Sequence, residues 1–343
     1  MPDATAQERP LSPALFLETA NAFQRSAALK AAVELDLFTA LAEGTGTVED
    51  TATRCGAAPR GVRILCDYLT VLGFLTKTGD RHALTRDSAV FLDRRSPAYL
   101  GGTLEFTHSK RALEYNAHLT DAVRRGGAPP EGALAEDHPA WEQFARAMAP
   151  MMVFPAELLA RLVSVPDARP IRVLDIAAGH GFYGIAFAKR YPNAGVVGLD
   201  WPRVLEVARE NAQRAGVADR YELLPGSAFD VDFGQGRGVQ YDLVLLPNFL
   251  HHFDQSTCES LLRKVHDALA EGGRVVTLDY VPDEDRIHPP NPAQFALTML
   301  ANTPAGDAYT FKELEAMFQH AGFTRNALHE LLPTDNRVVI SER

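Results

Sequence analysis

The sequence predicts an α/β protein: a Rossmann-like, doubly wound sheet of seven strands whose last hairpin is antiparallel, preceded by an all-α, winged-helix region. Two observations support this fold class. From Ile171 onward, apolar runs of strand length alternate with helical patterns, as expected for a parallel sheet with helical crossovers. Before that point helical periodicity dominates, with a single short pair of strands. We therefore expect a winged-helix domain over 12–96, a helical linker over 97–168 and the sheet domain over 169–343.

Start and stop signals mark the N-terminal elements. Apolar spacing is helical from Leu15 to about Leu41. The later signals are a Thr47–Asp50 capping box, Pro59 in a first helical turn, Gly73 at that helix's end and a wing turn at Gly79–Asp80. This order of helix, helix and wing is the winged-helix pattern.

A winged helix that reads DNA needs a basic recognition helix. The corresponding helix here offers Arg60 and Arg63 against Asp67 and is otherwise apolar, so we expect it to be buried. The formal net charge of −10 also argues against nucleic acid as a partner.

Composition narrows the remaining function classes. Three cysteines without CxxC spacing predict free thiols in a reducing compartment, with neither a disulfide framework nor a zinc site. No apolar stretch approaches the roughly 18 residues needed to span a bilayer, and the polar N-terminus lacks a cleavage signal. We therefore expect a cytoplasmic protein. No metal is expected, because the acidic and histidine residues show no ligand spacing such as HExxH.

The sheet domain is predicted from seven strand-like runs. They are IRVLDIA (171–177), GVVGLD (195–200), YELLPG (221–226), YDLVLLPN (241–248), RVVTLDYV (274–281), RNALHELL (325–332) and NRVVISE (336–342). Helical patterns follow the first, second, fourth and fifth runs, and the helix before the sixth has Thr310 and Glu313 at capping-box spacing and Gly322 at its end. The last two runs form a hairpin.

The strongest motif is Asp175-Ile-Ala-Ala-Gly-His-Gly181, between the first strand and the first helix of the sheet domain. It lacks the Lys-Ser/Thr of a phosphate loop and departs from GxGxxG. Its glycines let a ligand approach the backbone closely, and an acid at the strand end suits a cationic ligand rather than a pyrophosphate. The alternative is a tight turn that merely needs glycines.

A second candidate is Asp200, at the end of the second strand and 19 residues after Gly181. A carboxylate there can accept both ribose hydroxyls of a nucleoside-bearing cofactor, and Trp201 could lie against the adenine. The alternative role is a cap for the helix that begins near Pro202, and the two roles are compatible.

The fourth strand ends in Asn248-Phe-Leu-His-His-Phe-Asp254. A neutral imidazole at this edge of the sheet can remove a proton from an acceptor hydroxyl. His251 is the stronger candidate for that role and His252 the weaker, whereas a structural histidine remains the alternative for either. Asp254 or Ser256 is expected to cap the next helix.

These motifs give the sequence a family resemblance. Residues 171–343 resemble the class I S-adenosylmethionine-dependent methyltransferase domain. With the winged helix, nearly the whole chain resembles the small-molecule O-methyltransferases typified by plant caffeate and flavonoid enzymes, in particular their bacterial branch of secondary metabolism. Motif order, spacing and domain order all agree with that family.

The resemblance implies a role for each candidate. Cofactor-binding residues would be Asp175, Gly179, Gly181, Asp200, Trp201, Ser227, Ala228, Phe229 and Asn248, and His251 would be the catalytic base. Met and aromatic residues of the linker, which would otherwise be core, would help to wall the acceptor pocket. The implied pocket residues are Phe144, Met148, Met152, His252, Phe295 and Met299. The winged helix would form a homodimer rather than bind DNA.

Two departures from the family leave alternatives open. Ala177 replaces the first glycine of the loop, and Ala308 stands where plant enzymes carry the glutamate that orients the histidine, with Asp307 as the nearest acid. The leading hypothesis is methylation of a hydroxyl on a small aromatic or polycyclic metabolite. The alternatives are C- or N-methylation, another cofactor-dependent reaction without methyl transfer, and a winged-helix regulator that senses the cofactor.

Overall fold

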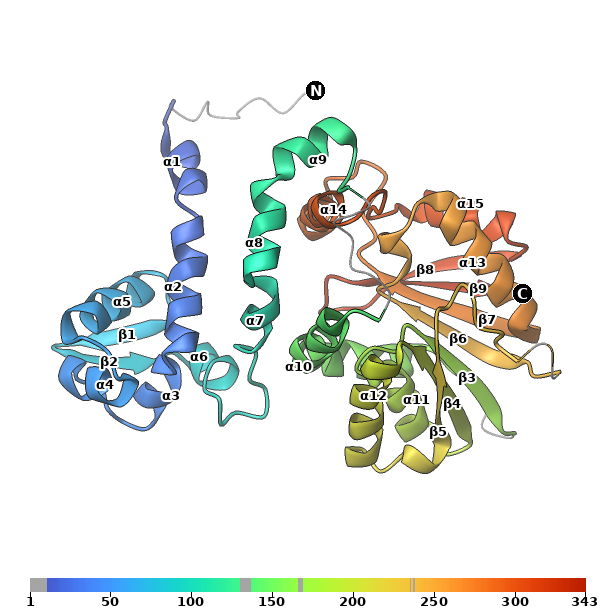
Figure 1. The fold of residues 1–343 in the computed structure, drawn as a ribbon, viewed down its shortest axis with the longest axis horizontal. Helices are drawn as coiled ribbons and strands as arrows, with labels where there is room; N and C mark the ends of the chain where they lie inside the picture. The colour runs from blue at the N-terminus through green and yellow to red at the C-terminus, as the bar shows by residue number, and fades with distance from the viewer. Residues whose placement is uncertain (1–10, 130–136, 166–168, 235, 237) are drawn as a thin grey trace, which may run out of the picture. The chain divides into compact units, whose positions relative to one another are not determined.

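The computed structural model describes residues 11–129, 137–165, 169–234, 236 and 238–343. The chain divides into two compact units between His108 and Ser109 (Figure 1). The three-part division expected from the sequence therefore stays a prediction, because this boundary separates compact units and does not delimit a linker. No helix in the described ranges is long and apolar enough to cross a membrane.

The first unit contains short helices and a two-stranded sheet. Its elements are α1 (Ala14–Ala20), α2 (Phe23–Glu34), α3 (Leu37–Ala42), α4 (Val48–Cys55), α5 (Pro59–Val71), β1 (Leu75–Thr78), β2 (Arg81–Leu84), α6 (Arg86–Phe91) and α7 (Thr103–Thr107). The expected helix, helix, wing order is present as α4, α5 and the antiparallel β1–β2 pair. Thr47 caps α4 by accepting the Asp50 amide, and Pro59 opens α5, as predicted.

The N-terminal span with helical spacing, Leu15 to Leu41, is divided into three helices, α1 to α3. Asp36 precedes α3 with a φ of 56°, a left-handed conformation that cannot continue a right-handed helix. The break turns α3 so that Leu37 and Phe38 are buried in the core of this unit.

The second unit is a doubly wound α/β domain with helices before it. Its helices are α8 (Lys110–Ala117), α9 (Leu119–Arg125), α10 (Pro139–Leu162), α11 (Phe182–Arg190), α12 (Pro202–Arg214), α13 (Gln255–Ala268), α14 (Pro290–Asn302) and α15 (Phe311–His320). Its strands are β3 (Ile171–Ile176), β4 (Ala194–Asp200), β5 (Tyr221–Pro225), β6 (Tyr241–Pro247), β7 (Leu269–Asp279), β8 (Arg325–Glu330) and β9 (Arg337–Glu342).

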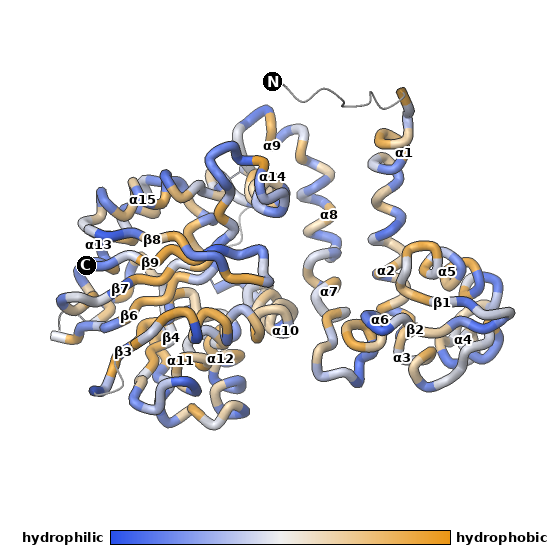
Figure 2. The backbone as a smooth tube through the Cα atoms, turned by 180° about the vertical axis from the view of Figure 1, so that it is seen from behind, coloured by the Kyte–Doolittle hydropathy of each residue, from blue (hydrophilic) through white to orange (hydrophobic). Residues whose placement is uncertain are grey.

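The sheet has the order β5-β4-β3-β6-β7-β9-β8 (Figure 1). Strands β3 to β7 are parallel and β9 is antiparallel to both of its neighbours, which confirms the predicted fold class. The strands β3 and β6 near the middle of the sheet are largely hydrophobic, whereas the edge strand β8 is mostly hydrophilic (Figure 2). One face packs on α10, α11 and α12, and the other packs on α13 and α15.

This topology places the chemistry at one edge of the sheet. The chain runs outward from β3 to β4 and β5, then returns to β6 on the other side of β3. Ligands of such sheets bind beyond the carboxyl ends of the strands, at the point where the order reverses. The motifs that follow β3, β4 and β6 therefore meet at a single place.

Candidate active site

Asp175, near the carboxyl end of β3, is completely buried beneath the glycine loop. Its Oδ2 accepts the Gly184 amide at 2.9 Å, which ties the strand to the first turn of α11, whereas Oδ1 has no hydrogen-bond partner. Burial raises the pKa of Asp175 to about 8, against the Gly184 amide, which lowers it. The structure therefore shows Asp175 supporting the loop from below, and direct contact with a cofactor stays a prediction.

The loop itself has a left-handed backbone at three positions: Ala177, Gly179 and Gly181, with φ of 54°, 58° and 78°. A Cβ on Gly181 would lie 2.9 Å from the Ala208 side chain, so packing on α12 requires this glycine. A Cβ on Gly179 would meet nothing nearer than 3.8 Å, so the space beside it is open. Ala177 holds its conformation at a cost of about 1 kcal/mol, and such strain concentrates at functional sites.

Asp200 ends β4 beside this loop. Its Oδ2 accepts the Gly179 amide at 2.8 Å and its Oδ1 accepts the Trp201 amide at 2.7 Å. Burial raises the pKa of Asp200 to about 6, against these two amides. The N-cap of α12 is Trp201 and no side chain caps that helix, so the capping role considered for Asp200 is not observed. Its carboxylate instead joins two strand-end loops.

The segment after β5 lies next to Asp200, because the Gly226 amide donates to the Asp200 carbonyl at 2.9 Å. Ser227 and Ala228 are buried and Phe229 is partly exposed. The residues predicted to lie beside an adenine are thus adjacent to the residue predicted to hold a ribose.

The segment after β6 carries the two histidines in a single 3-10 turn, Leu250–His252. His251 is buried, and its Nδ1 lies 2.7 Å from Oδ1 of Asp279, the last residue of β7. The same oxygen accepts the Tyr280 amide at 2.8 Å. A carboxylate at this distance holds the proton on Nδ1 and leaves Nε2 as the acceptor nitrogen.

Asp279 is the acidic partner of His251 that the sequence reasoning missed. Asp307, which stood nearest to the expected orienting position, instead pairs with Arg286 at 3.2 Å, and Ala308 is buried. The histidine therefore has an acidic partner from a neighbouring strand rather than from the segment before α15. An acid near the carboxyl end of the fifth predicted strand was the sequence feature from which this partner could have been predicted.

Aromatic rings surround the two histidines. The ring of Phe295, on α14, lies 4.7 Å from that of His251 and stacks on Tyr280 at 4.3 Å. The ring of His252 lies 4.3 Å from that of His251 and 6.3 Å from that of Trp141. Burial and the neighbouring His251 hold the pKa of His252 well below its ordinary value, so this ring is neutral.

The other predicted pocket residues differ in how closely they join this cluster. Met299 is buried on α14, one turn from Phe295. Met152 of α10 receives the Tyr183 hydroxyl at 3.5 Å, and Asn248 donates to the same hydroxyl at 3.3 Å. Phe144 packs on Trp141 and is partly exposed. Met148 is half-buried on the same helix, and nothing further fixes its role.

The side chains at this edge of the sheet are carboxylates, histidines and aromatic rings. Among the residues that the structure describes, no group of three or more His, Cys, Asp or Glu side chains could hold a metal ion. What the sheet edge does assemble is two buried carboxylates, a glycine loop with open space beside it, and an acid-oriented imidazole facing aromatic rings. The Asp200 carboxylate at the strand end, beside a glycine loop with open space, fits a cofactor that carries a ribose.

Comparison with known proteins gives the family of the chain. Residues 118–324 match the O-methyltransferase domain family, and residues 17–94 match the O-methyltransferase dimerisation domain family. The chain is 29% identical over 314 residues to the 3-hydroxy-5-methyl-1-naphthoate 3-O-methyltransferase of Streptomyces sahachiroi, covering 90% of this chain and 89% of that protein.

Solved structures extend the comparison. A Nostoc punctiforme PCC 73102 protein, named as an inferred O-methyltransferase, superposes with a TM-score of 0.92 at 52% identity, covering 98% of this chain and 100% of that one. Human N-acetylserotonin methyltransferase, solved in complex with S-adenosylmethionine, has the same fold with a TM-score of 0.83 at 23% identity and 99% coverage of both chains. The chain therefore belongs to the O-methyltransferase family and is an S-adenosylmethionine-dependent O-methyltransferase with an N-terminal dimerisation domain.

Proposed function

We propose that the chain methylates a hydroxyl of a small aromatic or polycyclic metabolite, with His251 as the general base. The observation that carries the proposal is the 2.7 Å contact between His251 Nδ1 and Asp279 beside the stacked rings of Phe295 and Tyr280. A base held in one tautomer serves an acceptor that must lose a proton, which a hydroxyl does. C- or N-methylation needs no such oriented pair.

The residues of the sheet edge fit the cofactor. Asp200 would hold the ribose hydroxyls, the 227–229 segment would lie along the adenine, and the loop from Ala177 to Gly181 would face the methionine portion. Asn248 would contact both cofactor and acceptor. When bound, S-adenosylmethionine supplies an activated methyl group on a sulfonium, so the protein's main contribution is alignment of the two reactants.

The remaining chemistry belongs to the chain's own residues. His251 Nε2 would accept the hydroxyl proton, and the Asp279 carboxylate would stabilise the imidazolium that forms. The half-buried rings around this pair would limit access of water and stack on a flat acceptor. His252, neutral and half-buried, would contact the acceptor without taking its proton.

The acceptor class is inferred from the walls of the site. Phe295, Tyr280 and Trp141 present ring faces and edges, and Met152 and Met299 add adaptable thioethers. The naphthoate acted on by the Streptomyces sahachiroi relative is a flat bicyclic acid of this class. We propose that α10, within the expected linker, contributes to this pocket.

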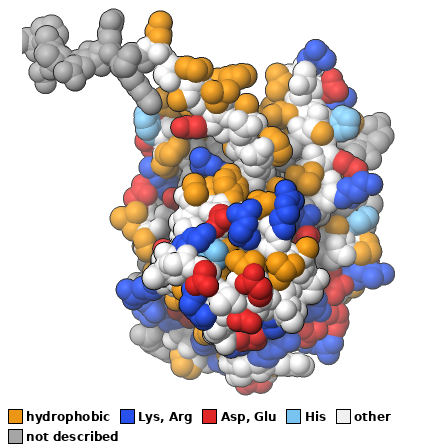
Figure 3. Space-filling view, turned by 90° about the vertical axis from the view of Figure 1, so that its left-hand side faces the viewer, with side chains coloured by type: hydrophobic (Ala, Val, Ile, Leu, Met, Phe, Trp, Pro, Cys, Tyr) orange, Lys and Arg blue, Asp and Glu red, His pale blue; other side chains and the backbone are white. Residues whose placement is uncertain are grey.

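We further propose that the first unit forms a homodimer in the cytoplasm and does not bind nucleic acid. Large apolar side chains of its first helices are exposed, namely Leu15, Phe16, Leu17 and Phe23, and hydrophobic side chains gather near α1 in the space-filling view (Figure 3). The proposed location is supported by the cysteines, all three of which are free thiols, as expected in a reducing compartment.

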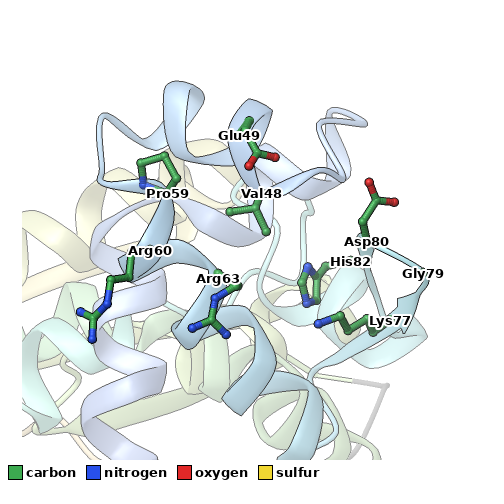
Figure 4. Close-up of a pocket in the computed structure, with 9 residues that line it drawn as sticks. All are labelled: Val48, Glu49, Pro59, Arg60, Arg63, Lys77, Gly79, Asp80 and His82. Atoms are coloured by element: carbon green, nitrogen blue, oxygen red, sulfur yellow. The ribbon is translucent and has the colours of Figure 1, made fainter.

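Two of the basic side chains beside the wing are neutralised by an acidic neighbour. A surface hollow of about 520 Å³ next to the wing is bordered by Arg60, Arg63 and Lys77, with Glu49 and Asp80 opposite (Figure 4). Arg63 and Lys77 both pair with Asp67, at 2.8 and 2.5 Å. Charges that are neutralised in this way argue against a phosphate-binding surface.

The test compares two adjacent histidines. His251→Ala should lower kcat at least a hundredfold, the usual range for loss of a general base being about 10²–10⁴. S-adenosylhomocysteine affinity, measured by calorimetry, should stay near wild type, because the proposed cofactor contacts lie elsewhere. His252→Ala should lose much less. Near-normal turnover of His251→Ala would remove the base from the proposal and return C- or N-methylation to first place.

A further inference from the structure

Helix α13 contacts both of the loops that the proposed function uses. At its N-terminal end, the Cys258 thiol donates to the Leu250 carbonyl at 3.3 Å, within the turn that carries His251. Two turns later, Lys264 Nζ donates to the carbonyls of Ala228 at 2.9 Å and Phe229 at 3.1 Å. One rigid helix thus holds the catalytic turn and the adenine-side segment at a fixed separation.

The Lys264 ammonium is held in a specific geometry. The side chain is half-buried and its Nζ lies 4.4 Å from the centre of the Phe233 ring, a cation–π distance. Burial lowers the pKa of Lys264 below its ordinary value, against the nearby Asp230 and Asp232 carboxylates, which raise it. A surface lysine with a solvated ammonium would have none of these contacts.

The segment that Lys264 holds depends on local contacts for its shape. The amides of Asp230 and Val231 both donate to the Ser227 carbonyl, which closes a tight bend. Ser227 Oγ accepts the Phe229 amide at 3.2 Å. Lys264 therefore adds a side-chain anchor from α13 to a bend that these local hydrogen bonds also stabilise.

The same bend also touches the catalytic loop directly. The Phe229 ring lies 5.0 Å from the Phe253 ring in an edge-to-face arrangement, and Phe249 lies 5.1 Å from Phe253. A shift of the 227–229 backbone would therefore move a ring that packs against the loop carrying His251.

We infer that Lys264 is a positioning residue for the cofactor, which keeps the 227–229 segment in its binding-ready conformation through the carbonyls of Ala228 and Phe229. The inference rests on the proposed function, since it takes this segment as the adenine side of the site. Lys264 acts through the backbone of that segment and needs no contact with the cofactor or the acceptor.

The experiment compares Lys264→Met, which keeps the aliphatic stem but removes the donors, with Lys264→Arg, which restores two donors. Arg263→Met is the control, because Arg263 is exposed on the same helix and pairs with Glu259. Lys264→Gln replaces Lys264→Met should that variant fail to fold. Three quantities are measured: hydrogen exchange of the 227–231 amides without ligand, the Kd of S-adenosylhomocysteine, and the steady-state constants.

In Lys264→Met, the 227–231 amides should exchange at least several-fold faster without ligand. The Kd of S-adenosylhomocysteine and the KM of the cofactor should both rise about tenfold, the effect of losing hydrogen bonds from a charged group, while kcat changes less than threefold. Lys264→Arg should recover most of the affinity, and Arg263→Met should match wild type. Wild-type exchange and affinity in Lys264→Met would overturn the inference, as would equal losses in Arg263→Met.

Failure of the proposed function would give a different result. If S-adenosylhomocysteine does not slow exchange of the 227–231 amides in the wild-type protein, this segment is not the adenine side. Protection in the wild type together with unchanged binding by Lys264→Met would instead refute the role of Lys264 alone.

Discussion

Asp279→Asn tests the pair on which the proposed mechanism depends. The carboxylate accepts from His251 Nδ1 at 2.7 Å and from the Tyr280 amide at 2.8 Å. The side chains of His251 and Asp279 are each less than one-tenth exposed. Asparagine has the same shape and one remaining acceptor oxygen. The substitution therefore removes the negative charge, and it allows the amide nitrogen to face the ring and impose the wrong tautomer.

The magnitude follows from the geometry. Two unit charges about 4 Å apart at an effective dielectric constant of about 20 interact by about 4 kcal/mol. The neutral hydrogen bond that asparagine can still make returns about 1 kcal/mol. The remaining 3 kcal/mol or so of lost imidazolium stabilisation corresponds to about a hundredfold decrease in kcat.

The assay is single-turnover methyl transfer with saturating cofactor, alongside calorimetry with S-adenosylhomocysteine. Asp307→Asn is the matched control, because that carboxylate pairs with Arg286 and lies outside the His251 contact. We expect Asp279→Asn to lose turnover with unchanged cofactor affinity, and Asp307→Asn to retain both. Retention of most turnover by Asp279→Asn, or an equal loss in Asp307→Asn, would refute the orienting role.

Two further predictions follow from the buried carboxylates. Because burial raises the pKa of Asp200 to about 6, its ionised fraction falls about tenfold between about pH 7.5 and pH 5, and S-adenosylhomocysteine affinity by calorimetry should weaken over that range. An Asp200→Asn variant should bind more weakly throughout and lose this pH dependence; a wild-type protein with pH-independent affinity would contradict the ribose assignment. Burial raises the pKa of Asp175 to about 8, so the folded state keeps a proton that the unfolded chain releases near its ordinary pKa, and stability falls as pH rises between these values. Asp175→Asn should therefore raise the Tm of the ligand-free protein at pH 7. The gain in free energy of unfolding should be at most about 4 kcal/mol and should shrink near pH 4. An Asn variant that is less stable at pH 8 would show that the carboxylate is ionised in the folded chain.

Elements with strong local signals could be predicted from the sequence. The Thr310–Glu313 pair forms a full capping box at the start of α15, because a side chain three residues away satisfies amides that the helix leaves free. The parallel sheet followed from alternating periodicity, since buried strands and amphipathic helices have different repeats. The positions of Asp200 and His251 followed from strand ends, because carboxyl ends of parallel strands share one edge.

Contacts between distant segments could not be predicted in the same way. Asp279 looked like the end of a strand, and only the register between β6 and β7 brings it to His251. The continuation of α10 through Pro150 and Pro155 was likewise not apparent, because proline removes a helical donor and usually ends a helix. Packing of that helix on α11 and α12 outweighs the local cost.

The register of β6 against β7 explains why the side chains of His251 and Asp279 are in contact. Pro247 lies opposite Leu278, and the next amide, that of Asn248, donates to the Leu278 carbonyl at 2.7 Å. Asn248 then turns the chain with a left-handed φ of 53°, which ends the strand and folds the following 3-10 turn back over the end of β7. Asp279, one residue beyond the last pair, is thereby directly below His251. Since side chains alternate between the faces of a strand, a one-residue shift of β7 would point this carboxylate to the opposite face and leave the histidine without its partner. The acidic partner of His251 is thus specified by sheet register, so a search near the plant-enzyme position at Ala308 could not find it.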